Sequence, residues 1–154
     1  MKTYRTFSSE ETKDLGAQFA RETLRALQKN HKHATHAAIF ALKGDLGAGK
    51  TTFVQGFFKG LGLKKHAASP TFIIMRRHAL GKMGNVFHID AYRLKKAKDL
   101  ATLDFKAAAS EPNNIILIEW ADRVRNILPK SAVWLEFKHG PAAHEHERSI
   151  IRKR

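Results

Sequence analysis

The sequence predicts a three-layer α/β domain built on a mixed central sheet, and three patterns support that prediction. A short apolar run at 36–42 leads directly into a glycine-rich loop, and a helical pattern follows over 50–61. Residues 114–120, NIILIEW, have the continuous apolar character of a strand buried on both faces. Two runs at 70–80 and 86–94 flank the turn-forming residues GKMGN, which predicts an antiparallel hairpin.

One strand and one helix are expected before the glycine-rich loop. Residues 3–7 predict the strand, and Ser8 with Glu11 three positions later forms the capping-box pattern of a helix start. Apolar side chains then recur at helical spacing, at Leu15, Phe19, Leu24 and Leu27. Gly62 is in position to end the helix that follows the loop.

The last third of the chain predicts short elements. Residues 95–111 are expected to be helical in part, and 121–128 predict a short helix that Pro129 stops. Two late apolar runs, 132–137 and 147–154, predict further strands. Strands of both orientations are therefore expected in one sheet.

The composition is that of a single globular domain over residues 1–154. Hydrophobic residues make up 43% and charged residues 27% of the chain, which is an ordinary balance. The absence of cysteines excludes disulfides, thiolate metal sites and cysteine nucleophiles. No run reaches the roughly 18 apolar residues of a membrane span, and the N-terminus lacks the apolar core of a signal peptide. We therefore expect a cytoplasmic protein with no membrane partner.

The net charge is the unusual feature of the composition. At +14, with an isoelectric point near 10.3, it favours polyanionic partners such as nucleotides, RNA or acidic proteins. The basic residues are scattered along the chain rather than gathered in one stripe. Contact with RNA, direct or through a partner, and a merely basic solvated surface both remain open.

Residues 44–51 match the phosphate-binding loop (P-loop) pattern G-x-x-x-x-G-K-[ST] without a mismatch. Glycines let backbone N–H groups turn inward around phosphate oxygens, and the next helix directs its positive end at the anion. Lys50 is expected to reach the β- and γ-phosphates, and the Thr51 hydroxyl to ligate Mg²⁺. The expected nucleotide-binding residues are Gly44, Asp45, Leu46, Gly47, Ala48, Gly49, Lys50, Thr51 and Thr52. An incidental glycine-rich turn is the alternative, but the flanking strand and helix favour a P-loop NTPase fold.

Nucleotide hydrolysis also needs an acidic side chain at the end of a neighbouring strand, and the chain offers Glu119 and Asp90. Glu119 ends a buried strand, where an isolated carboxylate is costly unless a metal or a cation compensates it. Alternation along the other strand places three side chains on one face: His88, Asp90 and Tyr92. The structural alternatives are ion pairs, of Asp90 with Arg93 or a lysine and of Glu119 with Arg123.

Three weaker signals accompany the motif and the acids. The hydroxyls of Ser69 and Thr71 flank a proline in a segment where many P-loop enzymes place a mobile switch. Trp120 is more typical of packing than of chemistry. The histidine-rich stretches 31–36 and 144–146 lack carboxylates in a recognisable zinc spacing, so they do not predict a metal site.

Four segments, in this order, resemble the TsaE family: GDLGAGKTTFVQGFFKGLG, SPTF, FHIDAYRL and LIEWADRV. The resemblance covers roughly residues 8–138 and is more specific than the P-loop alone, because D-x-Y-R-L and I-E-W are not general P-loop features. It departs from the family after SPTF, where an acidic and aromatic pair is usual and this chain has Arg76 and Arg77.

The resemblance implies a P-loop ATPase that binds ATP and Mg²⁺ and hydrolyses ATP slowly on its own. It implies association with TsaB and TsaD proteins, which transfer a threonylcarbamoyl group to adenosine 37 of certain tRNAs. By matching positions, Lys50 would contact phosphates, Thr51 and Glu119 would hold Mg²⁺, and Asp90 would serve hydrolysis. The other matched residues would lie beside the nucleotide or in a switch-like segment: Trp120, Ser69 and Thr71.

Two other functions are compatible with a P-loop. A small-molecule kinase would need an acceptor pocket and a lid, for which 154 residues leave little room. A nucleic-acid-binding module that has lost catalysis would not need the intact set of Lys50, Thr51, Asp90 and Glu119. A GTPase is disfavoured because no N-K-x-D guanine-specificity motif occurs.

Overall fold

The computed structural model describes all residues of the chain except 31–33, 64–73, 95–97, 102–103, 142–145 and 154. The described residues form one seven-stranded sheet in the order β1-β7-β6-β2-β5-β4-β3. Its strands are β1 (Lys2–Thr6), β2 (Ala38–Gly44), β3 (Met75–Ala79), β4 (Asn85–Asp90), β5 (Ile115–Glu119), β6 (Val133–His139) and β7 (Arg148–Lys153). The helical elements are α1 (Ser9–Asn30), α2 (Lys50–Gly60), α3 (Lys98–Ala101), α4 (Phe105–Ser110) and the 3₁₀ segments η1 (Gly81–Met83), η2 (Ala91–Arg93) and η3 (Ala121–Ile127).

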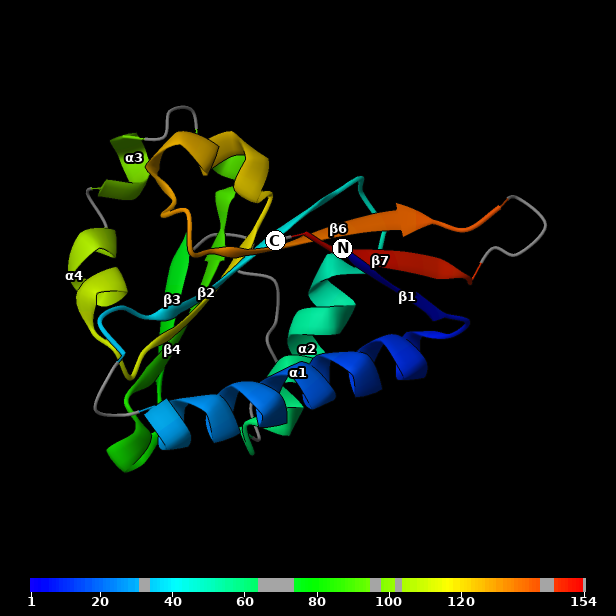
Figure 1. Ribbon diagram of the computed structural model, residues 1–154. Helices are drawn as coiled ribbons and strands as arrows, with labels where there is room; N and C mark the ends of the chain where they lie inside the picture. The colour runs from blue at the N-terminus through cyan, green and yellow to red at the C-terminus, as the bar shows by residue number, and fades with distance from the viewer. Residues whose placement is uncertain (31–33, 64–73, 95–97, 102–103, 142–145, 154) are drawn as a thin grey trace.

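The sheet is mixed, as the sequence predicts. Strands β6, β2, β5 and β4 run parallel to one another in its centre. The predicted hairpin is present as β3 paired antiparallel with β4 on one edge. On the other edge β7 pairs antiparallel with β6, and β1 pairs antiparallel with β7. The two ends of the chain therefore lie side by side in the sheet (Figure 1).

Helices cover both faces of the central strands, which confirms the predicted three layers (Figure 1). On one face α1 and α2 pack through a cluster rich in phenylalanine, whose rings meet mostly edge to face. On the other face α4 and η3 pack against β2, β4 and β5 through smaller side chains. Each fully buried phenylalanine contributes about 1.5–3 kcal/mol through removal of apolar surface from water, so the first face supplies much of the core.

The contact between α1 and α2 is unusually close because glycines line it. A Cβ at Gly16 would meet the backbone oxygen of Phe53 at 2.2 Å, and a Cβ at Gly56 would meet that of Lys13 at 1.9 Å. Any larger residue would push the helices apart. This close approach brings the start of α1 beside the start of α2, and hence beside the P-loop.

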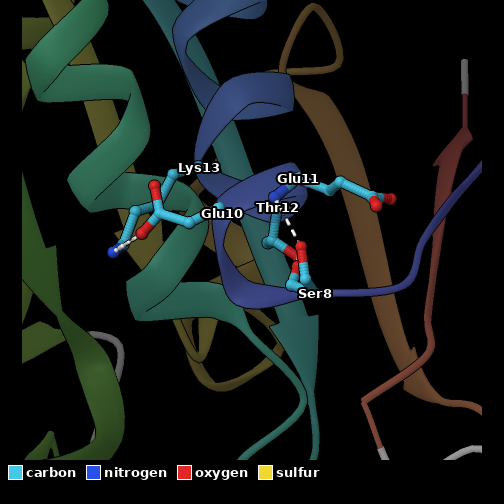
Figure 2. A network of polar contacts seen from close by, with 5 residues as sticks. All are labelled: Ser8, Glu10, Glu11, Thr12 and Lys13. Atoms are coloured by element: carbon cyan, nitrogen blue, oxygen red, sulfur yellow. Dashed lines mark hydrogen bonds and ion pairs between the residues drawn. The ribbon is translucent and has the colours of Figure 1, made fainter.

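The start of α1 follows the predicted capping box with one difference (Figure 2). Ser8 Oγ accepts from the Glu11 N–H at 3.1 Å. Glu11 Oε2 accepts from the Phe7 N–H at 2.9 Å rather than from that of Ser8. Thr12 Oγ1 donates to the Ser8 carbonyl at 3.0 Å and so ties the first turn together. Among the residues that the structure describes, none of the helices is long and apolar enough to cross a membrane.

Most strand boundaries differ from the prediction by a few residues, and two of these differences affect the residues around the P-loop. The strand predicted at 36–42 begins and ends two residues later in the structure. Strand β2 therefore ends on Gly44, the first residue of the P-loop motif. The run predicted at 86–94 is a strand only as far as Asp90. The Asp90 carboxylate accepts the Tyr92 N–H at 3.0 Å and thereby starts the 3₁₀ segment η2. Tyr92 therefore does not continue the strand face that carries His88.

Candidate functional site

The P-loop connects β2 to α2 in the way that the sequence predicts. Gly47 and Gly49 have φ values of 74° and 98°, which is the left-handed region that favours glycine. No described side chain caps the start of α2, so the positive end of the helix is directed at the loop. Leu46 lies at the tip of the loop, where its carbonyl is 3.0 Å from His139 Nε2. Backbone amides and the positive start of a helix are the groups that suit an anion.

Lys50 lies folded across the mouth of this loop. Its Nζ donates to the carbonyls of Gly44 at 2.6 Å and Asp45 at 2.7 Å, and it lies 3.9 Å from the ring centre of Trp120. The residue is only 4% exposed. Burial lowers the pKa of Lys50, while the negative charges of Glu119 and nearby aspartates oppose that shift. The ammonium is thus held by weak neutral acceptors and an aromatic face.

Glu119 joins the P-loop to the neighbouring strands through two hydrogen bonds. Thr51 Oγ1 donates to Glu119 Oε2 at 2.7 Å, and Glu119 Oε1 lies 2.9 Å from His88 Nε2. Glu119 is 2% exposed and His88 is fully buried. A carboxylate oxygen without a proton only accepts hydrogen bonds, so we assign a ring hydrogen to His88 Nε2. The result is a buried chain from His88 through Glu119 to Thr51.

His88 is the residue that sequence reasoning missed. Its place beside Asp90 on β4 was visible from alternation, but nothing local pointed to Glu119, which lies 31 residues away. Its second ring nitrogen, Nδ1, is buried and has no hydrogen-bond partner among the described residues. His88 therefore directs its one assigned polar contact at Glu119.

Asp90 and Trp120 lie at the same edge of the sheet. Asp90 on β4 is paired in register with Glu119 on β5, so the two acids end adjacent parallel strands. Trp120 follows Glu119 in the left-handed conformation, with φ 57°, and its ring packs on Tyr92 with centres 5.0 Å apart. Arg123, the alternative partner considered for Glu119, lies over the Tyr92 ring instead.

Two hollows lie on either side of the P-loop. The smaller, of about 240 Å³, is lined by Ser8, Ser9, Thr12, Gly47, Gly49, Thr52, His146 and Arg148. The larger, of about 530 Å³, is lined by Lys43, Gly44, Asp45, Trp120, Asp122, Glu136, Phe137, Lys138 and His139. Neither hollow could be predicted from the sequence, because its walls combine segments that lie far apart along the chain.

Some predicted residues cannot be placed. Ser69 and Thr71 lie outside the described residues, as do most of the histidines in 31–36 and 144–146. Within the described part of the chain, no group of three or more potential metal-ligating His, Asp or Glu side chains occurs.

The residues present suit a magnesium–nucleotide complex. The Thr51 hydroxyl and the Glu119 carboxylate are hard oxygen donors held 2.7 Å apart, which is the donor type that Mg²⁺ prefers alongside phosphate oxygens and water. Lys50, the first residue of α2, and the positive start of that helix lie next to Thr51. The arrangement can therefore bind a phosphate chain with its metal at the carboxyl end of parallel strands.

Comparison with known proteins gives a consistent family. A family model described as "Threonylcarbamoyl adenosine biosynthesis protein TsaE" matches residues 6–150. Proteins named tRNA threonylcarbamoyladenosine biosynthesis protein TsaE are similar: that of Bacillus subtilis is 34% identical over 73% of this chain and 66% of its own length. That of Haemophilus influenzae is 34% identical over 66% and 63%, and that of Streptomyces coelicolor 42% identical over 54% and 57%. The chain thus spans less than two thirds of the length of these relatives.

A solved structure is also similar over nearly the whole chain. The crystal structure of YdiB from Bacillus subtilis matches with a TM-score of 0.70 at 28% sequence identity. The match covers 98% of this chain and 83% of the other. The order of strands and helices described above is therefore a known arrangement.

Proposed function

Because the chain belongs to the TsaE family, we propose that it is a magnesium-dependent ATPase that supports threonylcarbamoylation of adenosine 37 in tRNA. In this proposal a TsaB-like and a TsaD-like protein perform the transfer itself. The family model and the curated relatives, all named for threonylcarbamoyladenosine biosynthesis, support the pathway. One contact supports the ATPase above all: the 2.7 Å hydrogen bond between Thr51 on the P-loop helix and Glu119 at the end of β5.

In the proposed complex the phosphates lie against the backbone amides of the P-loop. Lys50 turns from the carbonyls of Gly44 and Asp45 toward phosphate oxygens, because an anionic oxygen is a stronger acceptor than a neutral carbonyl. Trp120 keeps its ring against the ammonium and limits the water that reaches it. Partial burial makes the lysine charge act more strongly on the phosphates than it would in bulk water.

Thr51 and Glu119 would hold the magnesium ion, which when bound neutralises charge on the β- and γ-phosphate oxygens. His88 keeps Glu119 oriented through its Nε2–H and leaves the other carboxylate oxygen directed at Thr51. Asp90, at the end of the adjacent strand, accepts a hydrogen bond from the attacking water and orients it. The water oxygen then bonds to the γ-phosphorus as the bond to the β–γ bridging oxygen breaks, and ADP, inorganic phosphate and a proton leave.

The smaller hollow is the proposed place of the sugar and base. Thr52 lies in its wall, directly after the two P-loop residues that face the phosphates, and Arg148 and Thr12 face it from β7 and α1. At about 240 Å³ it is small for a whole nucleoside, so part of the base would project into solvent. Hydroxyl and guanidinium donors suit a ribose and a polar base edge.

The experiment that tests the function is a reconstituted modification reaction. Cognate TsaB-like and TsaD-like proteins, unmodified tRNA and an activated threonylcarbamoyl donor are combined with ATP and Mg²⁺, with and without the chain. We expect several modified adenosines per TsaD-like protein with the wild-type chain, and about one without it or with Glu119→Gln.

Two outcomes would contradict the proposal in different ways. If the wild-type chain hydrolyses ATP but never increases turnover with the cognate pair, the pathway assignment fails. If the γ-phosphate is recovered on a small-molecule acceptor rather than as inorganic phosphate, the chain is a kinase. Phosphate release and modified tRNA are therefore measured in the same samples.

A further inference from the structure

The edge half of the sheet carries a basic face that no described helix covers. Helices α1 and α2 lie against one face of this half, whereas Figure 1 shows no described helix over the other face of β7 and β1. Neither of these strands contributes to the second apolar cluster. The cross-strand register places charged side chains on this open face, among them Lys43, Glu136, Lys138 and Lys153. We refer to these four residues as the lysine cluster.

Glu136 organises the lysine cluster. Its Oε1 lies 3.2 Å from Lys43 Nζ and 3.9 Å from Lys138 Nζ, and its Oε2 lies 2.5 Å from Lys153 Nζ. The hydrogen bond from Lys153, with those from Lys43, holds the pKa of the Glu136 carboxyl below its usual range. The carboxylate therefore stays ionised and fixes lysines from three neighbouring strands in one place.

The lysine cluster has a surplus of positive charge. Three ammonium groups surround one carboxylate, which leaves a net charge of +2, and three ammoniums carry more N–H donors than two carboxylate oxygens can accept. The side chains of Lys138 and Lys153 are 57% and 43% exposed, so their remaining N–H donors face solvent. Arg125, whose guanidinium lies over the Trp134 ring, extends the basic area toward η3.

The chemistry of this face favours RNA over an acidic protein as its partner. Lysine is depleted in protein–protein interfaces, whose centres are apolar and aromatic. Here the centre is a fixed group of ammoniums, and the Trp134 ring beside them is covered by Arg125. Lysine and arginine side chains are common contacts to a phosphate backbone, which they bind without reading sequence.

We propose that the lysine cluster on the open face of β6, β7 and β2 binds the phosphate backbone of RNA. The choice of tRNA as the natural ligand rests on the proposed function, whereas the surface itself rests on the charges described above. The cluster also borders the larger hollow beside the P-loop, which Lys43, Glu136 and Lys138 help to line. RNA bound there would lie next to the nucleotide site without entering it.

The test is RNA binding measured by fluorescence anisotropy across a range of salt concentrations. The probes are unmodified tRNA and a single-stranded RNA of mixed sequence. We expect the double variant K138A/K153A to bind both roughly tenfold more weakly than wild type, with a salt dependence less steep by about 1 for each lysine removed. Lys43 still pairs with Glu136 in this variant, so the sheet should remain intact, and thermal melting checks this.

Matched variants make the test specific. The charge-conserving K138R/K153R should bind like wild type, and K82A/K106A, which removes two exposed lysines elsewhere, should lose little. Equal losses in K138A/K153A and K82A/K106A would overturn the proposal, as would the absence of RNA binding by wild type at low salt. Tighter binding of polyglutamate than of RNA would also overturn it in favour of an acidic protein. ATP binding is measured separately, so a failure of the ATPase proposal would be recognised as such.

Discussion

Glu119 and Glu136 lie on the two strands that flank β2, and their charges are compensated in opposite ways. Glu119 is paired in register with Leu42 and Glu136 with the next residue, Lys43. Glu119 is met by a hydroxyl and an imidazole. Glu136, whose side chain is 17% exposed, is met by three lysines.

The different partners of the two glutamates suit Glu119 to binding a ligand and Glu136 to stabilising the surface. A buried carboxylate that accepts from a hydroxyl and an imidazole rather than from ammonium groups attracts a cation, and Lys50, whose pKa its charge raises, donates to carbonyls instead. Glu136 is already paired with lysine side chains, and the surplus positive charge of these lysines faces solvent. The first arrangement suits a metal that arrives with a nucleotide, whereas the second suits a fixed surface.

The largest expected effect is at Lys50. If ATP is hydrolysed at the P-loop beside Glu119, Lys50→Ala should lower ATP turnover about 100-fold or more. The substitution removes the only lysine in the P-loop motif and the positive charge that it directs at the phosphates. Lys59→Ala, on the same helix, is the control and should change turnover little. Phosphate release with and without Mg²⁺ measures both. A Lys50→Ala variant with normal turnover would remove the P-loop from the mechanism.

The pH dependence of Lys50 refines this prediction. Burial lowers the pKa of the lysine, so the ammonium loses its proton at a lower pH than an exposed lysine would. ATP affinity should therefore fall as the pH rises through this lowered pKa, whereas Lys50→Arg should keep whatever affinity it has to higher pH, because arginine stays charged. An identical alkaline limb in both proteins would mean that another group titrates.

The next effect compares the two glutamates directly. Glu119→Gln should lower Mg²⁺-dependent turnover about 100-fold, since the charge that attracts the metal is gone. Glu136→Gln should leave turnover nearly unchanged and lower stability instead, because three lysines lose their shared anion. Turnover and urea unfolding are measured for both variants. Loss of turnover in Glu136→Gln alone would reverse the roles assigned to the two acids.

A smaller effect is expected at His88, which acts on the metal through Glu119. His88→Gln should raise the Mg²⁺ concentration needed for half-maximal turnover about 10-fold, as is usual for residues that orient a metal ligand. The control is His78→Gln, since His78 also packs on Phe58 but is on the neighbouring strand β3. Mn²⁺ binding without nucleotide gives a readout besides turnover. Equal changes in both variants would indicate a packing role only.

The parts of this site that the sequence predicted are those carried by local patterns. The P-loop motif is a run of eight residues that joins the end of a strand to the start of a helix, so its conformation follows largely from its own glycines. Glu119 is predicted as a site residue because a carboxylate at the end of a buried apolar strand is costly unless a metal or a cation compensates it. The end of β4 was placed too late, because a single side-chain bond from Asp90 to the Tyr92 N–H overrides the strand pattern.

The parts that the sequence did not predict depend on which strands become neighbours. The contact of His88 with Glu119 requires β4 and β5 to lie side by side in one register. The lysine cluster requires β2, β6 and β7 to be adjacent, although Lys43 and Lys153 lie at distant positions in the sequence. Apolar periodicity sets which face of a strand is buried, but it does not set strand order.

The smallest expected effect is the dependence on pH of the stability that Glu136 contributes. The lysines hold the pKa of Glu136 below the usual 4.5, so the stabilisation should be fully present above that pH and should disappear as the pH falls through the lowered value. Wild type should therefore exceed Glu136→Gln by about 1 kcal/mol near pH 6, with the gap closing in acid. Urea unfolding at several pH values measures this. Glu10→Gln is the control, because the exposed pair of Glu10 with Lys13 also lowers the pKa of its carboxyl but should leave the urea midpoint unchanged. A gap that stayed constant down to pH 3 would mean that Glu136 stabilises the sheet by its shape rather than by its charge.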